Sequence, residues 1–229
     1  MAVISVIRST GLLMQADVAA FCSACQKALD QHFGLAWGVT ATIVPIEPGE
    51  VIPAGSWQVH LVNNSTEASA LGFHDASGPG ASPEAFVAVE DDQKDGTSWQ
   101  VTASHEIWEM LADPYITGVV QMTNGAGVSY TIAMECADAC EDDQFAFEID
   151  GIKISAFMTR AWFDPKGVAP FTYPAILAIN APFTQADGGY ISKRRLPDGQ
   201  WTQDFAARMG PRCRPKAASS RTMRRFNAL

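Results

Sequence analysis

The pattern of apolar and polar residues predicts a helix followed by strands at the start of the chain. Between residues 17 and 33, apolar side chains recur at helical spacing, and Gly34 follows as the expected end of the helix. Residues 36–47 and 56–64 alternate apolar with polar positions and are rich in β-branched and aromatic residues, which predicts two strands. The stripe of the helix that we expect to pack on these strands comprises Val18, Phe21, Cys22, Cys25, Leu29 and Phe33.

A second helix is predicted near the middle of the chain. Residues 72–84 have the composition of a loop, residues 85–91 read as a short strand, and residues 93–97 as a turn. A helix then starts near Thr97 or Ser98, either of which can cap exposed backbone N–H groups, and ends about Ala112 because Pro114 cannot continue it. Its apolar stripe, typical of a half-buried helix, comprises Val101, Trp108, Leu111 and Ala112.

Strands return after this helix, and coil follows them. Residues 127–137, 144–150 and 152–163 are predicted strands, and Asp150-Gly151 is a strong signal for a two-residue hairpin between the last two. Beyond residue 164 the chain is rich in Pro, Gly and Arg. We therefore expect one α/β domain over residues 1–192 and an extended C-terminal arm over residues 193–229.

Charge divides the chain in the same way. The net charge is −9, but residues 1–192 hold 6 basic and 23 acidic side chains, whereas residues 193–229 hold 10 basic and 2 acidic ones. A basic arm of this kind contacts neighbouring protein subunits or nucleic acid, or is a solubilising tail. The body of the chain is therefore acidic and the arm basic.

Bulk composition favours a folded protein in a reducing compartment. Of the 229 residues, 47% are hydrophobic, which is enough for a substantial core, and no run approaches 18 apolar residues. We expect no membrane contact and no export signal, and hence a cytoplasmic location. The five cysteines form an odd set, and Cys22 and Cys25 read as buried thiols on the first helix.

The central helix carries the most informative chemistry, the sequence H-E-x-x-E. His105 and Glu109 are four residues apart, so one face of the helix presents an imidazole nitrogen and a carboxylate oxygen to a common point. Zinc accepts both ligand types, and Glu106 is placed where a general base receives the proton of a water molecule. The competing interpretation is a helix that carries these residues by chance.

A third ligand is available from an acidic segment at residues 134–143. Glu135 and Asp138 are the leading candidates because they lie nearest the end of a predicted strand, and Asp113 is a local competitor one turn past Glu109. The alternative for this segment is a solvated acidic loop. A metal site at His105, Glu109, and Glu135 or Asp138 is the prediction.

Several motifs follow one another along the chain: the helix SHEIWEMLADPY, the segment ECADACEDDQFAFEIDGIKISAFMTRAWFDP and the later PFTQADGGY. Together they resemble a family of zincin-like, largely uncharacterised bacterial and phage proteins, in a similarity that spans about residues 57–192. The resemblance implies a zincin-like α/β (α+β) fold, in which a twisted mixed sheet packs on helices. It also implies a metal held by His105, Glu109 and an acid of the segment from Glu135 through Asp138 to Glu141, with Glu106 as the base.

The implied activity is metal-dependent hydrolysis, of the peptidase kind, with zinc as the metal. A carboxylate-rich ligand set would also take calcium or manganese. Because the resembling group includes phage proteins, the alternative is a non-catalytic structural or decorating component of a virion or other large assembly. In that alternative the basic arm contacts neighbouring subunits.

Other candidate residues are weaker. We expect the strand at residues 86–90 to be the edge strand along which a peptide substrate pairs. His74 and Asp75 lie in the predicted loop before it, where a histidine is usually a plain surface residue. His32 and His60 are expected to be structural, and an oxyanion-stabilising hydroxyl has two weak candidates, Tyr115 and Tyr190.

Overall fold

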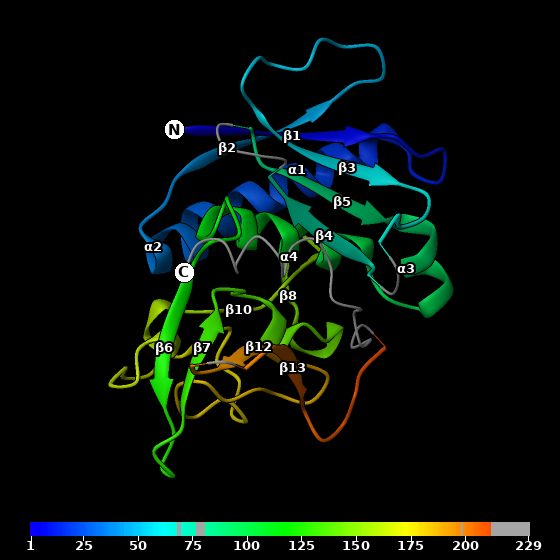
Figure 1. Cartoon of the computed structure of the whole chain (residues 1–229). Helices are drawn as coiled ribbons and strands as arrows, with labels where there is room; N and C mark the ends of the chain where they lie inside the picture. Colours follow the sequence, from blue (N-terminus) through cyan, green and yellow to red (C-terminus); the bar gives the residue numbers. More distant parts are fainter. Residues whose placement is uncertain (68–69, 77–80, 198, 212–229) are drawn as a thin grey trace.

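The structure is a computed structural model that describes residues 1–67, 70–76, 81–197 and 199–211. It is an α+β protein in which two main sheets lie on either side of the central helix (Figure 1). The α+β class expected from the sequence is thus confirmed. In the part of the chain that the structure describes, no helix is both long and apolar enough to cross a membrane.

The first sheet has five strands in the order β2-β1-β3-β5-β4. Neighbouring strands run parallel except for β4, the last strand, which is antiparallel to β5. The strands are β1 (Ala2–Arg8), β2 (Ala41–Ile46), β3 (Trp57–Val62), β4 (Gly72–Asp75) and β5 (Glu84–Ala88).

Strand β4 corrects two predictions. It occupies the start of the segment that was expected to be a loop, and it makes β5 an inner strand, so the predicted edge strand at residues 86–90 is wrong. The composition of residues 72–84 is that of a loop, but cross-strand pairing with β5, including the stack of Phe73 on Phe86 with ring centroids 5.0 Å apart, imposes the strand.

The first helical segment covers the sheet and is longer than predicted. Helix α1 (Gln15–Ala28) continues through a π-helical turn, η1 (Leu29–Phe33), into α2 (Gly34–Trp37). All six residues of the predicted apolar stripe are buried, Cys22 and Cys25 among them. The expected stop at Gly34 is wrong; the helix ends at Gly38, whose φ of 68° is the left-handed conformation that glycine adopts readily.

Helix α4 (Trp99–Ala112) lies between the first sheet and the rest of the chain (Figure 1). The helix α3 (Val89–Asp95) precedes it, where a strand end and a turn were expected. Ser98 is the N-cap residue of α4, although its hydroxyl makes no capping hydrogen bond. Trp108 stacks on Phe33 with centroids 4.5 Å apart, and its indole donates a hydrogen bond to Ser155 O. Residues 101–111 are all buried, so the helix is more enclosed than its stripe predicted.

The second sheet is antiparallel, in the order β13-β12-β7-β6. Its strands are β6 (Val119–Thr123), β7 (Ser129–Ala133), β12 (Tyr190–Arg195) and β13 (Trp201–Phe205). Residues 190–195 and 201–205, expected as coil, are therefore paired strands, and the predicted domain boundary at residue 192 falls within β12. About half of the predicted basic arm, residues 212–229, lies outside the described residues.

Short elements complete the fold between β7 and β12. The hairpin of β8 (Phe147–Ile149) and β9 (Ile152–Ile154) turns at Asp150 and Gly151, with φ of 51° and 77°, which confirms the predicted two-residue turn. The remaining short strands are β10 (Phe157–Met158) and β11 (Thr172–Tyr173), and the single helical turns are η2 (Asp138–Cys140), η3 (Asp143–Phe145) and η4 (Arg160–Phe163).

Candidate metal centre

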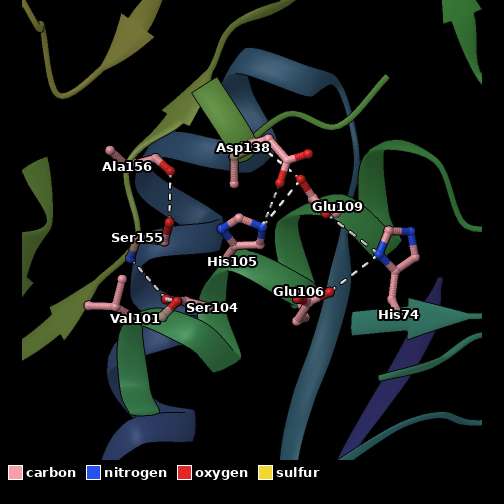
Figure 2. A network of polar contacts seen from close by, with 10 residues as sticks. His74, Val101, Ser104, His105, Glu106, Glu109, Asp138, Ser155 and Ala156 are labelled. Carbon is pink, nitrogen blue, oxygen red and sulfur yellow. Dashed lines mark hydrogen bonds and ion pairs between the residues drawn. The ribbon is translucent and has the colours of Figure 1, made fainter. Parts of the chain in front are cut away.

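His105 and Glu109 project from one side of α4, as their spacing predicted (Figure 2). His105 Nε2 lies 3.4 Å from Glu109 Oε1. Ser104, the residue before His105, links α4 to the neighbouring chain. Its hydroxyl donates a hydrogen bond to Gln100 O at 2.8 Å and accepts one from the N–H of Ser155 at 2.8 Å. These bonds fix the helix that carries the two ligand candidates.

The acidic segment after β7 folds back over this face of α4. Asp138 Oδ1 lies 3.4 Å from His105 Nε2, and the N–H of Ala137 donates to Glu109 Oε1 at 3.3 Å. Glu135, Asp138 and Glu141 are all buried. The alternative of a solvated acidic loop is therefore wrong for these three residues.

The separations of the two carboxylates from His105 are also compatible with ligands around one metal ion. Glu109 Oε1 and Asp138 Oδ1 each lie 3.4 Å from His105 Nε2, which is long for an N–H···O bond. Ligands bound to zinc at about 2.0 to 2.1 Å in a tetrahedron stand about 3.3 Å from one another. The donor types of His105, Glu109 and Asp138 suit zinc, and the two separations from His105 are close to this value.

The pKa values of Glu109 and His105 are both raised in this group. Burial, together with the nearby Asp138 and Glu135, raises the pKa of Glu109 to about 7. Burial alone would lower the pKa of His105, but Glu109 and Asp138 outweigh it and raise that pKa well above its usual value. A cation bound to these groups would displace their protons.

His74 belongs to this site, although its sequence context indicated a surface loop. It lies on β4, is 0% exposed, and its Nδ1 is 3.4 Å from Glu106 Oε2 and 3.6 Å from Glu109 Oε2 (Figure 2). Its neighbour Asp75 is partly exposed and accepts a hydrogen bond from the N–H of Ala76. No local signal marks His74, because β4 is short and its neighbours have loop composition.

Glu106 lies on the side of α4 that faces β4. It is buried, and its carboxylate is close to both His74 and the backbone of β4. A Cβ atom added to Gly72 would lie only 2.8 Å from Glu106 Oε1, so the glycine makes room for this side chain. Glu106 therefore lies beside the donor group, on the same side of α4 as His74.

The remaining candidates, Asp113, Tyr190 and Tyr115, lie in different surroundings. Asp113 accepts hydrogen bonds from the N–H groups of Thr117 and Gly118 at the end of α4, and it belongs to neither group of potential metal ligands found among the described residues. Tyr190 is buried and hydrogen-bonds Asp138, whereas Tyr115 is 49% exposed.

The other two histidines have ring partners instead. His32 stacks on Tyr173 and accepts or donates a 3.0 Å hydrogen bond with its hydroxyl, and His60 stacks on Phe86. These contacts agree with the structural roles predicted for both.

Comparison with known proteins adds no assignment. We found no family model, curated protein or solved structure that matches this chain. The interpretation of the site therefore stands on the geometry described above.

Proposed function

We propose that this chain is a zincin-like metalloprotein that binds a divalent cation, zinc foremost, and uses it for hydrolysis. The observation that carries the proposal is that two buried carboxylates, Glu109 and Asp138, each lie 3.4 Å from Nε2 of the buried His105, a spacing found between ligands of one ion. The zincin-like assignment is supported by the H-E-x-x-E helix packing beneath a mixed sheet whose antiparallel last strand, β4, runs beside it.

The residues around the donors have distinct chemical roles in this proposal. A divalent cation held by His105, Glu109 and Asp138 would supply Lewis-acid chemistry, polarising a substrate carbonyl and lowering the pKa of a water molecule. Glu106 takes a proton from that water and delivers it to the leaving amine. His74, 3.4 Å from Glu106, holds the carboxylate of this base in position. Tyr190 orients Asp138 through its hydroxyl.

A peptide is the substrate class that the fold favours. Strand β4 is the last strand of its sheet and runs beside the face of α4 that carries Glu106. An extended peptide gains main-chain hydrogen bonds by adding to such an edge, which places its carbonyl groups along the strand. The docking strand that we propose is therefore β4, in place of the segment 86–90 predicted from the sequence.

Metal content tests the site. Zinc bound to purified native protein is measured by elemental mass spectrometry and compared with His105→Ala and Asp138→Ala. We expect each of these two variants to bind one zinc ion per chain fewer than native protein. The control His60→Ala, on β3 outside the donor group, should keep the native amount. Native zinc content in His105→Ala would contradict the assignment.

Activity tests the chemistry separately. Glu106→Gln keeps the shape of the side chain but removes the base, so we expect zinc binding to persist and hydrolysis of a fluorescent casein substrate to fall about 10²- to 10⁴-fold. If native protein binds zinc but shows no turnover, the metal has a structural role. That outcome would favour the non-catalytic module of a larger assembly.

A further inference from the structure

Glu109 faces two histidines, one with each carboxylate oxygen. Its Oε1 lies 3.4 Å from His105 Nε2, and its Oε2 lies 3.6 Å from His74 Nδ1 (Figure 2). The histidines come from different elements, α4 and β4, and both are buried. A carboxylate held in this way is oriented to bridge two ions.

The surrounding donors divide into two groups around this carboxylate. His105, Asp138 and Glu141 each offer one ligand atom within 4.8 Å of the others. Glu109 and two further residues, His74 and Glu135, do the same on the other side. Each group has one imidazole and carboxylate oxygens, which is a complete donor set for a divalent transition metal ion.

Charge also favours more than one ion. The two groups and the adjacent Glu106 together hold five buried carboxylates against two imidazoles. Taking ionised carboxylates out of water is costly unless opposite charge accompanies them. One divalent cation offsets two of these charges, and a second leaves the group close to neutral.

We infer that the centre is dinuclear: a second divalent cation binds between His74, Glu109 and Glu135, with Glu109 as the bridging ligand. This inference rests on the cation proposed above at His105, Glu109 and Asp138. Two-metal hydrolytic sites place their ions about 3.5 to 4 Å apart, a separation that a single bridging carboxylate spans. In this arrangement His74 binds the ion through one ring nitrogen, and a hydrogen bond to Glu106 is left to its other ring nitrogen.

The stoichiometry of zinc in the full chain tests the inference. Metal-free protein is loaded with zinc chloride, desalted, and its bound ions are counted by native mass spectrometry. We expect two zinc ions in native protein, one in His74→Ala, one in His105→Ala and two in the control His60→Ala. Glu135→Gln is a second probe of the same half of the centre, should His74→Ala fail to fold, and is expected to hold one ion.

Manganese gives an independent readout of bridging. Protein loaded with two equivalents of Mn²⁺ should show the electron paramagnetic resonance spectrum of a coupled pair, and Glu109→Gln, whose amide is a poorer bridge, should show uncoupled ions. A coupled spectrum in native protein that becomes the six-line spectrum of an isolated ion in His74→Ala would support the inference.

The outcomes distinguish this inference from the proposed function. One zinc ion that is lost in His105→Ala and retained in His74→Ala overturns the second cation and leaves the first intact. One ion that is lost in both variants also overturns it, because a single ion would then use both histidines. Native protein without zinc overturns both proposals.

Discussion

Gly72 is the residue whose lack of a side chain most directly shapes the site. A Cβ atom there would lie 2.7 Å from Thr102 Cγ2 and 2.8 Å from Glu106 Oε1. Thr102 cannot easily yield, since its hydroxyl donates to Asp92 Oδ1 at 2.8 Å. We therefore expect Gly72→Ala to push β4 away from α4 and to lower the free energy of unfolding by about 1 to 3 kcal/mol in urea titration. The control Gly125→Ala, with nothing within 4 Å of the added atom, should change it by less than about 0.5 kcal/mol. Equal stability of the two variants would show that β4 does not pack against Glu106 as described.

Burial controls the reactivity of two thiols on α1. It raises the pKa of Cys22 from 9.0 to about 12 and that of Cys25 well above 9.0. The unfolded chain ionises these thiols near pH 9 and the folded chain does not, so their contribution to stability is complete below pH 9 and is lost as pH rises from 9 toward 12. At pH 8.5 we expect iodoacetamide to label both thiols at least tenfold more slowly in folded protein than in urea, as read by peptide mass spectrometry. Comparable rates in the two states would contradict the burial of this helix face.

At the scale of single residues, helical periodicity is the reason that the pairing of His105 with Glu109 was predictable, and chain proximity suggested Asp138. His74 was not predictable, because its place depends on pairing between β4 and β5, which no local pattern encodes. The difference is physical: a helix fixes its side chains by short-range geometry, whereas a strand's partners are set by tertiary contacts.

Among the elements, the end of α4 depends on Asp113. Its two carboxylate oxygens accept the N–H groups of Thr117 and Gly118 at 3.0 and 2.8 Å. Asp113→Ala would leave both donors without this acceptor, and we expect it to cost about 1 to 3 kcal/mol in the free energy of unfolding. The exposed Asp30→Ala, which removes one bond from Gln26 Nε2, should cost less than about 0.5 kcal/mol. Zinc content measured alongside should be unchanged in Asp113→Ala, and its loss would return Asp113 to the ligand candidates.

The elements that periodicity predicted well are those with long, regular patterns, such as α1, β3 and α4. Composition misled where glycine, proline or charge marks a loop. Gly34 lies inside a continuous helical segment. A Cβ atom at this position would lie only 2.8 Å from Leu29 O and from Val39 O, so glycine is needed there for packing and not to end the helix. The strand β12 ends in Lys193, Arg194 and Arg195, whose charges suggested an arm although their backbones pair with β7.

For the whole molecule, the central question is whether the chain beyond residue 192 is an appendage or part of the domain. Residues 193–195 pair with β7, the strand that leads into the acidic segment, and β13 completes the same sheet. Just before β12, the N–H of Ala186 donates to Ala139 O, and Gly189 approaches Ala139 so closely that a Cβ there would lie 2.3 Å from its carbonyl oxygen. The second sheet therefore supports the segment that presents Asp138.

Two truncations decide between an appendage and an integral part. A chain ending at residue 192 loses β13 and the paired half of β12, so we expect it to unfold at lower temperature than the full chain and to retain less zinc. A chain ending at residue 211 keeps both sheets and all the described donors, which lie between residues 74 and 141, and should match the full chain in zinc content. Calorimetry and elemental mass spectrometry on both chains give the two readouts. If the chain ending at residue 192 unfolded cooperatively at the native temperature with native zinc, residues 193–211 would be dispensable, and the metal centre would depend on the first sheet and α4 alone.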